Sequence, residues 1–207
     1  MSPQELGRIE KPPAERFAGK RKLYLVPLLF TRPNAPKGYA EKFARYWAQV
    51  REQLRNLEAG TGNVKRVYHE SVTGGGEEDL KMLAKLSPSS HRVVEDKRRR
   101  GAELEIVEDR ELLEETLDWE KCLLLGLVSE KAAKTVSELY VESSNKRYEH
   151  IGKRIDETLQ TGEAGLLFIG EGHRVQFPQD IEVFYISPPA LNEIHRWLRG
   201  QPDNREE

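Results

Sequence analysis

The sequence is poor in cysteine and has no long apolar run. Its 207 residues include a single cysteine, Cys122, so no disulfide can form within the chain. The longest apolar runs, residues 23–30 and 122–128, are far shorter than the roughly 20 residues of a membrane-spanning helix. The first 22 residues contain no apolar segment typical of a secretory signal. We therefore expect a soluble cytoplasmic protein that does not associate with membranes.

Motifs for metal and nucleotide sites are also missing. The five histidines form no His-Glu-x-x-His pair, and there is no Cys-x-x-Cys. Neither Gly-x-x-x-x-Gly-Lys-Ser/Thr nor Gly-x-Gly-x-x-Gly occurs, and the triple glycine 74–76 leads instead into Glu77, Glu78 and Asp79. These carboxylates suit the positive end of a helix and would repel a phosphate. We predict neither a metal nor a cofactor and interpret this segment as an acidic capped turn, with a metal-bridged phosphate site as the alternative.

The patterns that are present indicate strands alternating with helices. Apolar runs rich in strand-forming residues predict five strands, at 22–30, 63–72, 102–109, 163–170 and 180–187. Apolar residues at three- and four-residue steps predict helices at 39–57, 77–86, 88–100, 129–159 and 190–199. The fold class is therefore α/β, with a mixed or mostly parallel sheet of about five strands. Helices flank this sheet, and one of them is long and charged.

Three local features leave alternatives open. Residues 109–127 fit a helix better than a strand, although the apolar run 122–128, taken by itself, suits a buried strand. We expect Cys122 to be buried. The helix at 129–159 is either continuous or broken near 143–145. Pro27 cannot donate a hydrogen bond to a neighbouring strand, which favours a sheet edge or a bulge.

The composition predicts one folded unit. Residues 1–20 are polar and contain three prolines, which is typical of a flexible tail. We expect residues 21–200 to form a single α/β domain and residues 201–207 to fray. The succession of strand, helix and strand from 22 to 72 favours a β–α–β unit with parallel strands.

Two strand ends carry the residue types of a proton-transfer or anion-binding site. Glu171, His173 and Arg174 follow the strand at 163–170, and His69 and Glu70 end the strand at 63–72. Ligands of open α/β sheets bind beyond the carboxyl ends of the strands, where these side chains could meet. The alternative is a glycine turn between two strands with solvated side chains.

A basic run ends the helix predicted at 88–100. It consists of Lys97, Arg98, Arg99 and Arg100, and it could contact the phosphates of a nucleic acid. The same charges also complement the negative end of a helix dipole. The formal net charge of the chain is −2, so any attraction to nucleic acid would be local.

The C-terminal half of the chain contains a stretch that resembles known sequences. The stretch from NKRYEHIGKRIDETL to LNEIHRWLRG, residues 145–200, resembles an uncharacterised bacterial protein family, and the resemblance extends back through KLYLVPLLF and the first helix. The long charged helix leading into GEAGLLFIG is similar to release-factor-like domains of the archaeal and eukaryotic type. That resemblance implies association with the ribosome and with RNA. The catalytic Gly-Gly-Gln of those domains is absent, because the nearest match is Gly75-Gly76-Glu77.

These observations lead to three alternative functions. The first is a non-catalytic interaction domain associated with RNA or the ribosome. The second is a small enzyme that uses the acid, imidazole and guanidinium groups at the sheet edge. The third is a homo-oligomeric scaffold with the long helix as its interface.

Overall fold

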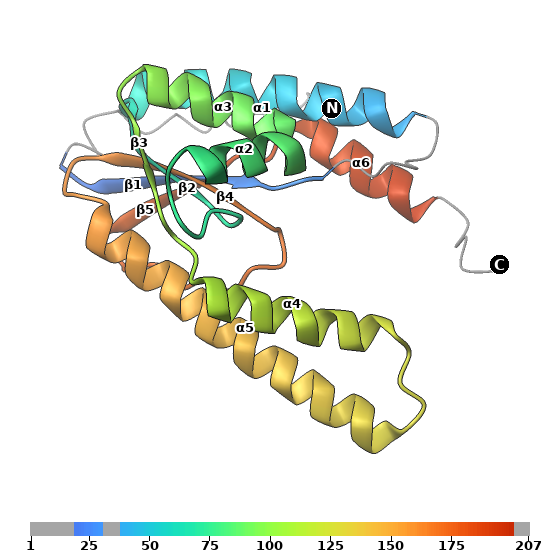
Figure 1. Cartoon of the computed structure of the whole chain (residues 1–207). Coiled ribbons are helices and arrows are strands. Elements are labelled where there is room, and N and C mark those ends of the chain that lie inside the picture. Colours follow the sequence, from blue (N-terminus) through green and yellow to red (C-terminus); the bar gives the residue numbers. More distant parts are fainter. Residues whose placement is uncertain (1–18, 31–37, 201–207) are drawn as a thin grey trace, which may run out of the picture.

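The computed structural model describes residues 19–30 and 38–200, so residues 1–18 of the predicted tail and the predicted frayed end 201–207 lie outside the described residues. A five-stranded sheet lies between two layers of helices (Figure 1). The strands are β1 Arg21–Pro27, β2 Val64–His69, β3 Glu103–Glu105, β4 Ala164–Ile169 and β5 Ile181–Tyr185. Their order is β3-β2-β4-β1-β5 and every neighbouring pair is parallel, which confirms the predicted α/β class.

Within the described residues, six helices surround this sheet. They are α1 Tyr39–Thr61, α2 Glu77–Leu86, α3 Pro88–Arg99, α4 Arg110–Leu124, α5 Glu130–Thr158 and α6 Pro189–Arg199. The segment 109–127, which fitted either a helix or a strand, contains helix α4. Asp109 caps this helix by accepting the Leu112 N–H at 3.0 Å. Helix α5 continues through residues 143–145, where the Ser143 hydroxyl donates to the Tyr140 carbonyl within the helix.

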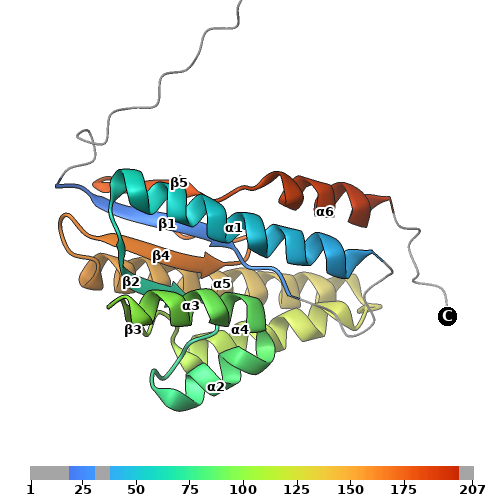
Figure 2. The same ribbon diagram turned by 90° about the horizontal axis from the view of Figure 1, so that it is seen from above.

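Both faces of the sheet are covered. Tyr24 and Val26 of β1 face the core formed with α1, α2, α3 and α6, whereas Leu23 and Leu25 face α5 (Figures 1 and 2). Since successive residues of a strand point to opposite faces, two covered faces require an unbroken apolar run. This explains why β1 reads as a continuous apolar segment.

The prediction of an edge position or a bulge at Pro27 is wrong. Strand β1 lies inside the sheet, between β4 and β5. Pro27 is its last residue and pairs in register with Ile169 of β4. On the other side, β5 ends at Tyr185, which pairs with Leu25. The proline therefore lies beyond the last paired residue of β5, where no strand partner needs its missing N–H.

Helices α4 and α5 form a hairpin that projects from the sheet (Figure 1). At its tip, the side chains of Leu124, Leu125 and Val128 are 81%, 79% and 102% exposed. Cys122 is half-buried rather than buried, because it lies near this exposed tip, where α4 packs along α5. Within the described part of the chain, no helix combines the length and apolar character needed to cross a lipid bilayer.

Candidate functional site

The connections after β2 and β4 leave these neighbouring strands toward opposite faces of the sheet. After β2 the chain continues into α2 and α3 on the α1 face. After β4, residues 170–180 cross the α5 face, where a Cβ atom on Gly152 would lie 2.8 Å from the Gln176 carbonyl oxygen. Ligands of doubly wound sheets bind where such connections diverge. The carboxyl ends of β2 and β4 are therefore a candidate site.

A buried cluster of two carboxylates and one guanidinium lies there. Glu70 follows β2, Glu108 follows β3, and Arg147 extends from α5. The Arg147 Nε donates to the two carboxylate oxygens of Glu108 at 3.0 and 2.9 Å. The Arg147 Nη2 lies 3.6 Å from Glu70 Oε2, and the Glu108 side chain is completely buried. The cluster holds two carboxylates for one cation.

The protonation of this cluster changes near neutral pH. Burial raises the pKa of Glu108 to about 7, although the hydrogen bonds from Arg147 act in the opposite direction. Burial also raises the pKa of Glu70, against the hydrogen bond from the Gly170 N–H. The pair should therefore gain a proton more readily than exposed carboxylates do.

We expect the substitution Glu108→Gln to change the pH dependence of stability. The unfolded state loses the Glu108 proton near its usual pKa of 4.5, whereas the folded state keeps it until about 7. The stability contribution of this proton is therefore complete below pH 4.5 and is lost as the pH rises through 7. Relative to E108Q, the wild-type free energy of unfolding should fall by about 3 kcal/mol across this range.

Urea unfolding of both proteins at several pH values measures this difference. The matched control is Glu149→Gln, which removes an exposed carboxylate of α5. The expectation would be contradicted if the difference in the free energy of unfolding between wild type and E108Q stayed constant with pH, as it should for the control.

Glu70 and Arg147 also line a cavity of about 540 Å³ beside the cluster. The walls of this cavity come from α2, from α4 and from residues that follow β1 and β2. Its volume is in the range of protein ligand sites. Chemically, the site offers carboxylates and apolar surface to a ligand.

His69 is a structural residue in the core. Its side chain is fully buried, its Nδ1 accepts the Ser71 N–H at 3.1 Å, and its Nε2 lies 3.0 Å from the Ser90 hydroxyl. Burial lowers the pKa of His69 to about 3, so the ring is neutral. Both ring nitrogens are therefore engaged inside the protein.

The three predicted residues after β4 lie apart from one another. Glu171 Oε2 is 2.7 Å from Nε2 of His195 on α6. The ring of His173 packs near Phe177, and its Nδ1 accepts the Val175 N–H at 3.3 Å. Of the five predicted residues, only Glu70 lines the cavity beside the buried cluster.

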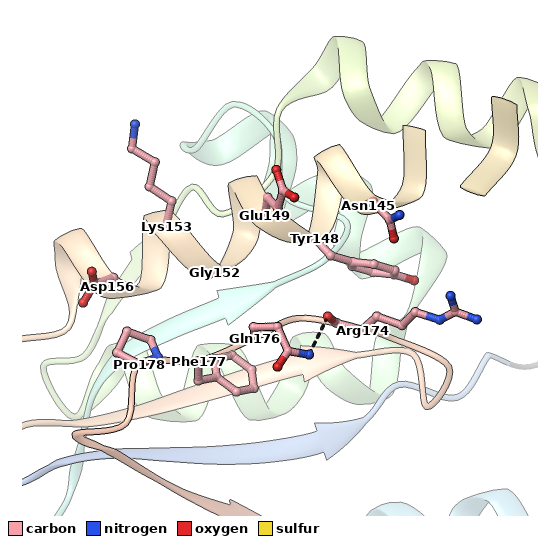
Figure 3. A pocket seen from close by; sticks show the side chains of 10 residues that line it. All are labelled: Asn145, Tyr148, Glu149, Gly152, Lys153, Asp156, Arg174, Gln176, Phe177 and Pro178. Carbon is pink, nitrogen blue, oxygen red and sulfur yellow. Dashed lines mark hydrogen bonds between the residues drawn. The ribbon is translucent and has the colours of Figure 1, made fainter. Parts of the chain in front are cut away.

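Arg174 lines a different hollow, of about 500 Å³, on the surface of α5 (Figure 3). Figure 3 shows its side chain extending away from Phe177 and Pro178, while its carbonyl accepts from the Gln176 amide at 3.3 Å. Lys153 also lines this hollow, on the side opposite the Arg174 guanidinium. Its charged groups therefore do not converge on one point.

The triple glycine forms a turn that binds a carboxylate of its own chain. The Asp79 Oδ2 accepts the N–H groups of Gly74 and Gly75 at 2.6 and 2.8 Å. Asp79 is buried and lies in the first turn of α2. Because this carboxylate uses the amides that would bind a phosphate, the geometry fits the acidic capped turn.

The basic run at the end of α3 is divided between the interior and the surface. The Lys97 Nζ lies 2.6 Å from Glu58 Oε2, and their side chains are only 4% and 7% exposed. Arg98 and Arg100 pair with acidic residues of the same helix, Glu95 and Asp96. The exposed members of the run are therefore Arg98, Arg99 and Arg100.

A broader basic surface surrounds this run. Helices α1 and α3 lie side by side (Figure 2), and Arg51, Arg55 and Arg100 line a groove of about 190 Å³ between them. Together, α1, α3 and Arg100 contain nine Lys or Arg residues and five Asp or Glu residues, whereas α4 contains two and five. We call the exposed surface of α1 and α3 around Arg51, Arg55, Arg99 and Arg100 the basic face. The protein therefore carries surfaces of opposite charge.

Sequence reasoning missed Glu108, Arg147, Arg51 and Arg55. Arg147 precedes the buried Ile151 and Ile155 at four-residue steps. A charged residue on the buried side of α5 could therefore have been recognised from the sequence. Arg51 and Arg55 are also four residues apart, a spacing that a search for continuous basic runs overlooks.

Comparisons of the chain with models of protein families, with curated proteins and with solved structures find no match.

Proposed function

We propose that the protein is a non-catalytic interaction domain that binds single-stranded RNA, free or in the ribosome, through the basic face. The observation that carries this proposal is the meeting of Arg51, Arg55 and Arg100 along one groove between α1 and α3. Guanidinium groups bind phosphate oxygens through paired hydrogen bonds, which makes arginine well suited to a nucleic-acid backbone.

Three of the four arginines of the basic face are available to a partner, whereas Arg100 is paired with Asp96. Among residues 19–30 and 38–200, no carboxylate lies within ion-pair distance of Arg51, Arg55 or Arg99, and all three side chains are exposed. The resemblance of the long charged helix and the GEAGLLFIG strand to release-factor-like domains also supports an RNA partner. The separation of His69, Glu171 and Arg174 favours a binding role over proton-transfer chemistry.

The substitutions Arg51→Gln and Arg55→Gln, made together, should weaken RNA binding and its dependence on salt. Each lost phosphate contact lowers the slope of log K against log salt by about 0.7 for a single strand, so the expected decrease is about 1.4. Fluorescence anisotropy with a labelled uridine 20-mer, at salt concentrations from about 50 to 200 mM, measures the slope.

The matched control is Lys134→Gln with Lys153→Gln, which removes the same charge from exposed positions of α5. Co-sedimentation of both variants with ribosomes extends the test to the assembled particle. Equal RNA affinity of the two double variants, or no binding by the wild type at 50 mM salt, would overturn the proposal.

A further inference from the structure

Exposed apolar side chains from three separate segments meet at the cavity between α2 and α4. Phe30 follows β1, Met82 and Leu86 belong to α2, and Leu117 belongs to α4. Their exposed fractions are 44%, 38%, 51% and 40%, and all four line the same cavity. We call this cavity and its walls the α2–α4 cleft. Exposed apolar residues that gather in one concavity typically mark a binding surface.

Helix α4 has a second apolar stripe that its packing against α5 does not explain. The buried Thr116 and the half-buried Leu112 and Trp119 lie on one side of the helix, which packs along α5. Another side of α4 carries Leu113, Leu117 and Leu124, because Leu117 and Leu124 follow Leu113 by four and eleven residues. This stripe is about 16 Å long, which matches about three turns of a partner helix.

The charges around the cleft indicate the charge of its partner. Glu114 and Glu120 are exposed on the α4 wall, and α4 as a whole carries five acidic and two basic residues. Two cations line the cleft: Arg147 is already paired with Glu108, and Arg110, the first residue of α4, is exposed. Glu114 and Glu120 outnumber Arg110 among the exposed charges of the cleft, so the cleft favours a positively charged partner over RNA.

We infer that the α2–α4 cleft binds a basic amphipathic helix of a partner protein. The apolar face of that helix would pack on Met82, Leu86 and Leu117, and its Lys or Arg residues would lie near Glu114 and Glu120. This surface is separate from the basic face, so the inference stands independently of RNA binding.

The test uses the full chain and two designed 14-residue peptides labelled with fluorescein. One peptide has leucines at helical i, i+3, i+4 and i+7 positions with lysines elsewhere, and the other replaces every lysine by glutamate. We expect the lysine peptide to bind at least tenfold more tightly in an anisotropy titration. Leu117→Glu should weaken its binding at least tenfold, whereas Val141→Glu, at a position 42% exposed on α5, should leave it unchanged.

Charge reversal gives a second test that does not alter the apolar floor. Glu114→Lys with Glu120→Lys should reverse the preference between the peptides, while Glu138→Lys with Glu142→Lys on α5 should preserve it. Equal binding of both peptides would overturn the inference. So would light scattering that showed a wild-type dimer dissociated by L117E, because a second copy would then occupy the cleft. An effect of L117E on RNA binding would also contradict it.

Discussion

Replacing Arg147 by methionine is expected to lower the free energy of unfolding by about 3–5 kcal/mol at neutral pH. The substitution keeps much of the aliphatic stem but leaves the Glu108 carboxylate, which is fully buried, without its cation. Glu70 loses the same partner. Burial of an unpaired charge costs more than the loss of an exposed ion pair, because water no longer solvates the charge.

Chemical unfolding at pH 7.5 and pH 5 measures this cost. Protonation of Glu108, whose pKa is raised to about 7, should reduce the cost at the lower pH. The control is Lys153→Met, which removes an exposed cation from the same helix. The double variant R147M/E108Q should recover part of the lost stability, since it no longer buries the Glu108 charge. A cost for R147M no larger than that of K153M would refute this account of the cluster.

Lys97→Met should destabilise the protein by a similar amount, about 3–5 kcal/mol, because it leaves Glu58 buried without a cation. Two residues further on, Arg99→Gln should change stability by less than about 0.5 kcal/mol, because its side chain is exposed. Urea unfolding of both variants gives the comparison directly. Similar costs at positions 97 and 99 would show that the basic run is not divided between the interior and the surface.

The local elements were predictable from the sequence because each carries its own periodicity. The stripe from Tyr39 to Leu54 identifies α1, and Ser129, whose hydroxyl accepts the Ala132 N–H, marks the beginning of α5. The predicted β–α–β unit is parallel, but β4 lies between β1 and β2. Since β1 and β4 are both apolar on their two faces, their composition does not specify which of them lies next to β2.

The site was less predictable, because its contacts join residues that are far apart in the chain. Arg147 and Glu108 are separated by 39 positions, as are Lys97 and Glu58. Such pairs depend on strand order and helix placement, which local patterns do not determine. A basic run therefore looked uniform in the sequence, although one of its four members is buried.

We propose that two surfaces of opposite charge bind different partners. Chemical-shift mapping of the isotopically labelled protein distinguishes the two surfaces, with the uridine 20-mer and the lysine-rich peptide added separately. RNA should perturb the amide signals of α1 and α3 around Arg51, Arg55 and Arg99. The peptide should perturb the amide signals of α2 and α4 around Met82 and Leu117. Perturbation of the same residues by both ligands, or of neither surface by its expected ligand, would show that the two surfaces do not bind different partners.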